Sequence, residues 1–393
     1  MMIKLNPQNK WLMVMVIAMS ILFASCSKEQ DAKDGTFSIQ TKIISINMFG
    51  NLVLDISDKQ MDKVGFEFAD MVSVECPSLP KTLEIPYIND YMMVGTWGIS
   101  LNSFADEATL TLALTNSSFH DRVGGKVGDN VTITLSKKGG FINNYRNLHL
   151  PFSEDRADYA SDEAFVNFHS VKGGVGDGKL YRSCKPLMGP NKNSRYIYAD
   201  ELARKAGVNT IISLSDSEDD WQNALNTGNV GKYSKELYQN NSLALHKMGI
   251  DFYLPATARE IGEVMRYMNN RTPPYLICCT MGRDRTGLLS IMLGILTGAT
   301  YQELEAGYMK SYLNLHNITK SHAGYQLLKK ITFDRILYII HKQGKIDIAE
   351  MNAMNEIDVA SFFPQLPANV ELYLTQLSGL EKAEMDGVIS KLR

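Results

Sequence analysis

The chain carries a cysteine and an arginine, Cys279 and Arg285, with five residues between them. A thiolate is a strong nucleophile, and a guanidinium presents a fork of N–H donors that fits two oxygens of a phosphate group. The hydroxyl of Thr286, directly after the arginine, can donate a hydrogen bond to the thiolate or to a leaving sulfur. These residue types at this spacing predict nucleophilic chemistry on a tetrahedral anion, and transfer of a phosphoryl group fits them best.

The segments on either side of this pair predict how it is positioned. Tyr275–Cys278 is a short apolar run typical of a buried strand, and Gly287–Leu296 is typical of a helix buried on most sides. A loop between a strand and a helix N-terminus can turn its backbone N–H groups toward an anion, and it lowers the pKa of a thiol beside them. We therefore expect a phosphate-binding loop that consists of Thr280, Met281, Gly282, Arg283, Asp284, Arg285 and Thr286.

This loop resembles the signature of the cysteine-dependent protein tyrosine phosphatases, Cys-x5-Arg-Ser/Thr. It is most similar to a bacterial branch with the loop His-Cys-x-x-Gly-Lys-Asp-Arg-Thr-Gly. Cys278 and Arg283 stand where that branch has histidine and lysine. The resemblance continues with less specific segments over residues 160–390, at Asn167–Phe168, Leu180–Ser183, Thr210–Leu214 and Gly298–Leu304.

The resemblance implies a mechanism. Cys279 would attack phosphorus to form a phosphocysteine, Arg285 and the loop amides would hold the phosphoryl oxygens, and water would release phosphate. This chemistry needs neither a metal nor another cofactor, and the histidines show no metal-ligand spacing. In the bacterial branch the histidine before the cysteine helps to orient and activate the thiolate, so Cys278 at that place predicts a slower enzyme.

The acid that protonates the leaving group is less well defined. Many tyrosine phosphatases carry it as an aspartate on a mobile loop, but the corresponding stretch here, Pro255–Glu260, has none. Asp284 lies within the signature, as in phosphoinositide phosphatases with an Asp-Arg-Thr run, and is the expected acid. Its alternative role is a salt bridge to a neighbouring arginine. The other candidate acids are Glu260 and, in an acidic loop after the strand at 209–214, Asp216, Asp219 and Asp220.

Other polar residues allow two interpretations each. Arg283 predicts a second cation at the pocket mouth, which suits phosphoinositides or inositol phosphates as well as phosphotyrosine; the alternative is a rim charge exposed to solvent. Arg182 either approaches the site or caps a strand. Cys278 is expected to be a small buried strand residue rather than a redox partner, because a vicinal disulfide is strained. His169 and His246 are expected to be structural polar residues.

The pattern from residue 36 to 141 predicts a small all-β domain, an antiparallel barrel or sandwich. Short alternating runs at 37–46, 51–56, 109–114 and 130–135 are separated by glycine-containing turns. Met48–Leu52 and Val127–Val131 faintly resemble the β-barrel domain of adenosyl-transferring halogenases. The catalytic half of those enzymes has no counterpart here, so we expect a binding, positioning or spacer module without their activity.

From residue 142 to 393 the pattern predicts an α/β phosphatase domain with a helical C-terminus. Strands are expected at 178–183, 209–214 and 250–254, and helices at 196–206, 260–269, 331–341 and 383–392. Strands that alternate with helices form a mostly parallel sheet flanked by helices. Ligands of such sheets bind at the carboxyl ends of the strands, which is where the loop after Cys279 is expected to emerge.

The N-terminus predicts export and anchoring to a membrane. Residues 1–25 combine Lys4 and Lys10 with an apolar run shorter than the about 20 residues of a membrane span, which is typical of a signal peptide. Phe23–Cys26 resembles a lipobox, so we expect lipidation of Cys26, followed by a polar tether at 26–35. The alternative is an uncleaved anchor. Both predict a membrane-anchored protein on the non-cytoplasmic side, in the periplasm or at the cell surface.

Composition excludes two classes. Loss of two lysines with the signal peptide changes the formal net charge from −3 to −5, and without a basic run a nucleic-acid partner is not expected. Five cysteines are too few for a disulfide scaffold of this length.

We expect a cysteine-dependent phosphatase of broad or dual specificity, which acts on phosphorylated proteins or phosphoinositides. The alternatives are a pseudophosphatase that binds phosphate with little turnover, and another thiol enzyme such as a rhodanese-like sulfurtransferase or an arsenate reductase. Thr286, Gly287 and the Asp284–Arg285 pair argue against both of these other thiol enzymes.

Overall fold

The structure is a computed structural model, and it describes residues 37–89, 99–103, 109–114, 117–188, 194–249, 252, 255–343, 345 and 357–393. The expected signal peptide, lipidated Cys26 and tether lie outside these residues, as does most of the strand expected at 250–254. Among the described helices, none has both the length and the apolar character that crossing a membrane requires.

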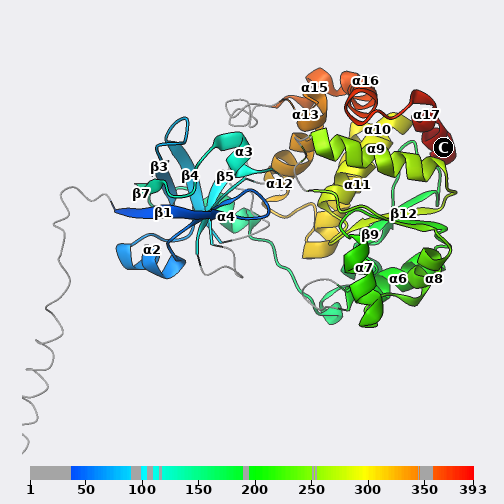
Figure 1. The fold of residues 1–393 in the computed structure, drawn as a ribbon, viewed down its shortest axis with the longest axis horizontal. Coiled ribbons are helices and arrows are strands. Elements are labelled where there is room, and N and C mark those ends of the chain that lie inside the picture. Colours follow the sequence, from blue (N-terminus) through cyan, green and yellow to red (C-terminus); the bar gives the residue numbers. More distant parts are fainter. Residues whose placement is uncertain are drawn as a thin grey trace, which may run out of the picture. The chain divides into compact units, whose positions relative to one another are not determined.

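Seven strands of the N-terminal part form a closed barrel (Figure 1, blue to cyan). In their order around the barrel they are β1 (Ser38–Ile46), β2 (Leu52–Leu54), β6 (Thr111–Leu114), β5 (Ile99–Asn102), β4 (Leu83–Ile88), β3 (Met71–Glu75) and β7 (Asn130–Lys137). The barrel closes because β1 pairs with both β2 and β7. Alternate residues such as Val72 and Val74 fill the interior. The expectation of a barrel or sandwich is thus resolved as a barrel.

The pairings of the barrel are antiparallel, except that β4 runs parallel to β5. Short helices lie between or after its strands: α2 (Asp58–Val64), α3 (Phe119–Val123) and α4 (Ile142–Leu148). Ser57 and Gln60 form a capping box at the start of α2. All seven strands fall within the range expected for the β domain. The boundary at residue 141 between two domains stays a prediction.

The C-terminal part contains a five-stranded sheet. Its strands, in spatial order, are β11 (Leu243–Leu245), β10 (Thr210–Ser213), β12 (Tyr275–Cys279), β9 (Leu180–Cys184) and β8 (His169–Ser170). The first four run parallel and β8 is antiparallel at the edge, so the sheet is mostly parallel as expected. The neighbour of β10 at this edge is β11, a three-residue strand that the sequence pattern did not indicate.

Helices cover both faces of this sheet (Figure 1). One face packs against α5 (Asp162–Phe165), α6 (Arg195–Lys205), α7 (Glu218–Asn226) and α8 (Lys232–Gln239). The other packs against α9 (Pro255–Asn269), α10 (Asp284–Thr297) and α11 (Tyr301–His316). Further short elements are η2 (Arg156–Asp158), α12 (Tyr325–Lys329), the π-helix η3 (Lys330–Asp334), α13 (Arg335–His341), α15 (Val359–Phe362), η5 (Phe363–Gln365), α16 (Leu366–Leu372), the π-helix η6 (Tyr373–Leu377) and α17 (Lys382–Leu392).

The central strand β12 places its two cysteines on opposite faces of the sheet. Successive side chains of a strand alternate between faces, and Cys278 belongs to the apolar cluster that contains Trp221 of α7. Cys279 belongs to the cluster that contains Leu288 of α10. The vicinal cysteines therefore have different surroundings, and Cys278 is the buried strand residue that the sequence predicted.

Candidate active site

Cys279 is the last residue of β12, and its side chain is only 3% exposed. Burial raises the pKa of a thiol, but the charge of Arg285 and hydrogen bonds from the hydroxyl and amide of Thr286 outweigh it here. The pKa of Cys279 therefore lies below its ordinary value.

The loop after Cys279 is held from outside through its carbonyl groups. Asn167 Nδ2 donates to the carbonyls of Met281 and Gly282, at 3.2 and 3.1 Å. Arg182 Nη2 donates to the carbonyls of Gly282 and Arg283, at 2.7 and 3.1 Å. Because a trans peptide points its N–H opposite to the preceding carbonyl, these bonds turn the amides that follow Gly282 and Arg283 away from the two donors. They leave those amides to face an anion inside the loop.

Glycine at position 282 is required by the close approach of two backbones. Gly282 has φ +65°, a left-handed conformation, and a Cβ built on it would lie 2.2 Å from the carbonyl oxygen of Ser183 on β9. The amide of Gly282 also closes a turn on the carbonyl of Cys279, at 3.3 Å. The loop is therefore pressed against the neighbouring strand, and a side chain at this position would displace it.

The helix that follows the loop contributes its N-terminus. α10 begins at Asp284, and the amide of Gly287 bonds the carbonyl of Arg283 at 2.8 Å. The amides of the three residues before Gly287 have no carbonyl partner within the helix, as at any helix N-terminus. Their partial positive charge stabilises an anion in front of them. The helix starts three residues earlier than its apolar pattern indicated, so it contributes Asp284, Arg285 and Thr286 to the loop.

Arg285 belongs to the first turn of α10 and is half-buried. Its Nη1 donates to the carbonyl of Met248 at 3.0 Å, and its Nη2 donates to the hydroxyl of Thr280 at 3.2 Å. Met248 follows β11 at the carboxyl end of the sheet. The guanidinium is thus held over the loop by two neutral acceptors, and its charge acts on Cys279.

Arg283 and Asp284 form a salt bridge at the start of α10. Arg283 Nε and Nη2 donate to the two carboxylate oxygens of Asp284, each at 3.0 Å. The guanidinium carbon of Arg283 also lies 5.1 Å from the ring centre of Tyr312 on α11, a cation–π contact. The side chain of Arg283 is 12% exposed, so it is not the solvated rim charge that was one interpretation. The alternative role of Asp284, a salt bridge to a neighbouring arginine, is present.

This strand, loop and helix lie within residues 173–392, which match the family model described as tyrosine phosphatase family. The chain belongs to the tyrosine phosphatase family. No curated protein matches it. A crystal structure titled uncharacterized conserved protein, from Thermotoga maritima, is similar at 19% identity and a TM-score of 0.22. The match covers 24% of this chain and 35% of the Thermotoga chain, so the chain spans about a third of that protein.

The alternative acids of this tyrosine phosphatase family member have other partners. Asp216 is buried and accepts from Lys185 Nζ and from the Ser213 hydroxyl, each at 2.5 Å. Its charge raises the pKa of Cys278, which lies on the face of the sheet opposite to Cys279. The acidic stretch expected as a loop is instead the start of α7, where Asp220 forms a capping box with Ser217.

The two remaining candidates also lie apart from the loop contacts. Asp219 is exposed in the first turn of α7. Glu260 lies 3.9 Å from His246 Nδ1, within the first turns of α9. The stretch Pro255–Glu260, expected as a loop, is helical because α9 begins at Pro255. Among the candidate acids, Asp284 alone belongs to the phosphate-binding loop.

Two residues of this family member with defined contacts in the structure had no role assigned from the sequence. Asn167 has φ +55° and occupies a turn before β8, and its Oδ1 accepts from Asn314 of α11 at 3.3 Å. The sequence signal for it was the resemblance of Asn167–Phe168 to the bacterial branch, and asparagine is one of the few residues that tolerate a left-handed turn. Lys185, which follows β9, reaches Asp216 after β10, on the far side of β12. The sequence alone does not predict this pair, because the two residues come together only through the order of the strands in the sheet.

Burial keeps the two central histidines of the domain neutral. Burial and then the charge of Arg182 lower the pKa of His169 to about 3. Its ring nitrogens lie 3.0 and 3.3 Å from the carbonyls of Asn167 and Gly307. Burial also lowers the pKa of His246. Both have the structural surroundings that the sequence predicted, and Arg182 approaches the loop rather than capping a strand.

Proposed function

We propose that the protein hydrolyses phosphomonoesters through a phosphocysteine formed on Cys279. Phosphotyrosine is the expected substrate, and phosphoserine, phosphothreonine and phosphoinositides are further substrates of a broad-specificity site. The observation that carries this proposal is the lowered pKa of the Cys279 thiol, which directly precedes the loop. Asn167 and Arg182 hold carbonyl groups of that loop by hydrogen bonds, and Arg285 is fixed beside it by the carbonyl of Met248. Membership of the tyrosine phosphatase family supports the same reaction class.

In the first step the Cys279 thiolate attacks phosphorus and a P–S bond forms. The P–O bond to the leaving group breaks, and its electron pair goes to the leaving oxygen, which takes a proton from an acid. Arg285 exchanges its neutral acceptors, the carbonyl of Met248 and the hydroxyl of Thr280, for two phosphoryl oxygens. The loop amides stabilise the remaining charge of the transition state.

In the second step a water molecule attacks the phosphocysteine. The P–S bond breaks, the thiolate leaves with the electron pair, and the water proton returns to the group that served as the acid. Asp284 is our assignment for that group, because it is the candidate carboxylate on the loop and its charge acts on the pKa of Cys279. It must first leave Arg283, which occupies both of its oxygens.

Hydrolysis of 4-nitrophenyl phosphate by the wild type and by Cys279→Ser tests the proposal. The variant should fall to the uncatalysed background, because a serine hydroxyl at this position is far less nucleophilic than a thiolate. Cys278→Ser is the matched control, since it makes the same chemical change on the opposite face of the strand. Equal hydrolysis by the wild type and Cys279→Ser would exclude the phosphocysteine.

A phosphate-binding protein with little turnover is the second candidate function. The observation that favours it is the salt bridge, because an Asp284 that stays bonded to Arg283 at both oxygens cannot donate a proton. Such a protein would bind inorganic phosphate at the loop and protect Cys279 from alkylation without hydrolysing esters. The same assay distinguishes the two, with phosphate protection as the second measurement.

We also propose that the protein acts at a membrane outside the cytoplasm, anchored through lipidated Cys26. The support is the sequence of residues 1–35, with its basic start, short apolar run and lipobox-like Phe23–Cys26. Cys26→Ala should move the protein from the detergent-rich to the aqueous phase of a Triton X-114 partition. Unchanged partition of that variant would refute the lipid anchor. A phosphorylated protein or a phosphoinositide at that membrane would be the substrate.

A further inference from the structure

A buried arginine without a carboxylate partner lies behind the phosphate-binding loop. Arg182 of β9 is 1% exposed, and its hydrogen bonds go to the carbonyls of Gly282 and Arg283. It forms no salt bridge with any carboxylate in the described part of the chain. A buried cation costs free energy unless polar or charged groups compensate it, so its burial here requires an explanation.

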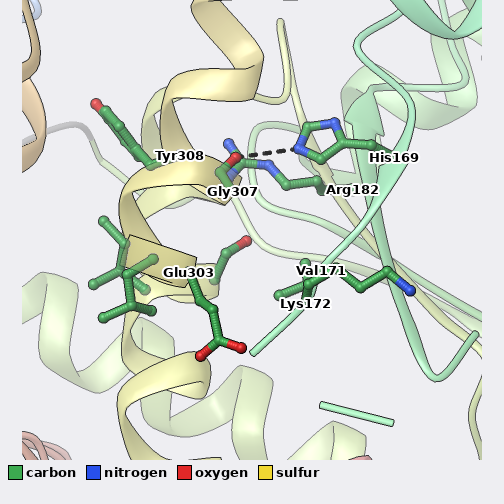
Figure 2. A pocket seen from close by; sticks show the side chains of 10 residues that line it. His169, Val171, Lys172, Arg182, Glu303, Gly307 and Tyr308 are labelled. Atoms are coloured by element: carbon green, nitrogen blue, oxygen red, sulfur yellow. Dashed lines mark hydrogen bonds between the residues drawn. The ribbon is translucent and has the colours of Figure 1, made fainter. Parts of the chain in front are cut away.

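The groups around Arg182 leave its charge directed toward the loop. Figure 2 shows Arg182 extending from β9 toward α11, alongside the hydrogen bond between His169 and Gly307. His169 is neutral because its pKa is far below its ordinary value. Tyr308 of α11 is a neutral phenol, since burial raises its pKa. The anionic groups that act on Arg182 are Cys279 and, more weakly, Asp284 at the start of α10.

The small cavity behind Arg182 is lined by one carboxylate, that of Glu303, which forms no salt bridge with Arg182. Its volume of about 20 Å³ has room for one or two water molecules. Lys172 and Glu303 both line this cavity (Figure 2). Lys172 is a cation bonded to Asp177, and Glu303 bonds Thr300 in the capping box of α11. The charge of Arg182 is therefore compensated by loop carbonyls on one side and by the Cys279 thiolate beyond them.

We propose that Arg182 is a positioning residue that couples the shape of the loop to its charge: it holds two loop carbonyls outward and supplies the buried positive charge beneath the bound phosphoryl group. This inference rests on the proposed function and deepens it. Arg285 binds phosphate from the open side of the loop, and Arg182 supports the anion from behind the loop without touching it. Loss of Arg182 then removes both the hydrogen bonds to the loop carbonyls and the positive charge. Loss of Asn167 removes hydrogen bonds only.

Asn167 is the matched comparison, because it also bonds two loop carbonyls but carries no charge. Arg182→Met removes both the bonds and the charge, Arg182→Lys keeps the charge but loses the fork, and Asn167→Ala removes bonds alone. The remaining titratable groups near Cys279 are unchanged in all three variants: Asp284 and Arg285 on α10, Cys184 on β9, and Cys278 on β12. Differences in Cys279 reactivity among the variants therefore separate charge from geometry.

The test measures the alkylation of Cys279 by iodoacetamide against pH, with the Cys279 peptide followed by mass spectrometry, with and without inorganic phosphate. Arg182→Met should raise the pH midpoint by about one unit or more, as expected for loss of a nearby opposite charge, and weaken phosphate protection about tenfold or more. Asn167→Ala should keep the midpoint and weaken protection. Arg182→Lys should keep the midpoint with intermediate protection.

A wild-type midpoint in folded Arg182→Met would overturn the proposal, and so would equal shifts in Arg182→Met and Asn167→Ala. If Arg182→Met does not fold, Arg182→Lys decides: a raised midpoint there, with the charge retained, overturns the role of the charge. These measurements need no turnover. An inactive wild type that shows the expected midpoints and protection would refute the proposed hydrolysis and leave this inference standing.

Discussion

Arg283 holds both carboxylate oxygens of Asp284 while its guanidinium lies against the ring of Tyr312. Three residues from a loop and the facing helix thus form one arrangement at the mouth of the site. The salt bridge compensates the charge of the Asp284 carboxylate. It also compensates the charge of Arg283, which allows that side chain to be largely buried. Catalysis through Asp284 requires this arrangement to open when substrate binds.

Replacement of Asp284 by asparagine should affect substrates according to their leaving group. An alkoxide or phenoxide of high basicity needs a proton as it leaves, whereas 4-nitrophenolate does not, so Asp284→Asn should lose about 10²–10⁴-fold in kcat on phenyl phosphate and much less on 4-nitrophenyl phosphate. Steady-state kinetics with both substrates measure this. Glu260→Gln is the control; a uniform small loss in Asp284→Asn would place the acid elsewhere.

Replacement of Thr286 should change the pH dependence of the reaction. Burial, the largest influence on the pKa of Cys279, raises it, and Arg285 and Thr286 bring the net shift below the ordinary value. The thiolate is the reactive form and exists above that pKa. Thr286→Ala therefore should raise the pKa and move the acid limb of the kcat/KM profile to higher pH. Ser290→Ala, which removes a hydroxyl one turn further along α10, should not move it.

Alanine at position 282 should abolish activity through geometry alone. Its Cβ would lie 2.2 Å from the Ser183 carbonyl oxygen, a position that no loop of this shape can accommodate. Gly207→Ala is the matched control, because Gly207 has φ +63° and nothing within 4 Å of the built Cβ. Both variants carry left-handed strain of about 1–2 kcal/mol, but only Gly282→Ala should lose phosphate protection of Cys279. Comparable protection in the two would contradict the packing argument.

Asp216→Asn should destabilise the protein without changing its pH profile. Removal of one partner from a buried ion pair costs about 3–5 kcal/mol, and Asp216 is 1% and Lys185 11% exposed. A thermal melt should show a large decrease in Tm, whereas Asp220→Asn, which weakens the capping box of α7 at its N3 position, should cost about 1 kcal/mol. Loss of one limb of the kcat/KM profile in Asp216→Asn would instead identify Asp216 as the acid.

Cys278→Ser should retain activity within a few-fold of wild type. Burial raises the pKa of Cys278, so it is a thiol rather than a thiolate, and its sulfur donates to the Ile212 carbonyl at 3.5 Å. A serine hydroxyl can make the same bond. Stopped-flow kinetics on 4-nitrophenyl phosphate measure the change. A loss comparable to that of Cys279→Ser would mean that Cys278 takes part in the chemistry.

The strand, loop and helix around Cys279 were predictable because they are contiguous, and local apolar patterns identify them. The barrel was predictable for a similar reason, since alternation in β1 and β7 indicates half-buried strands. The contacts of Asn167 and Arg182 with the loop were not, because they join segments about 100 residues apart. They depend on β9 lying beside β12. The three residues of β11 are too few for a periodic pattern.

Asn167 lies before residue 173, where the family match begins. A fragment cut at that residue would contain Cys279, Arg285 and the whole of α10, yet two loop carbonyls would lose a donor and the sheet would lose β8. The contacts that hold the loop therefore extend beyond the residues that match the family. Asn167 belongs to an irregular turn, where no periodic pattern of residues marks its contact with the loop.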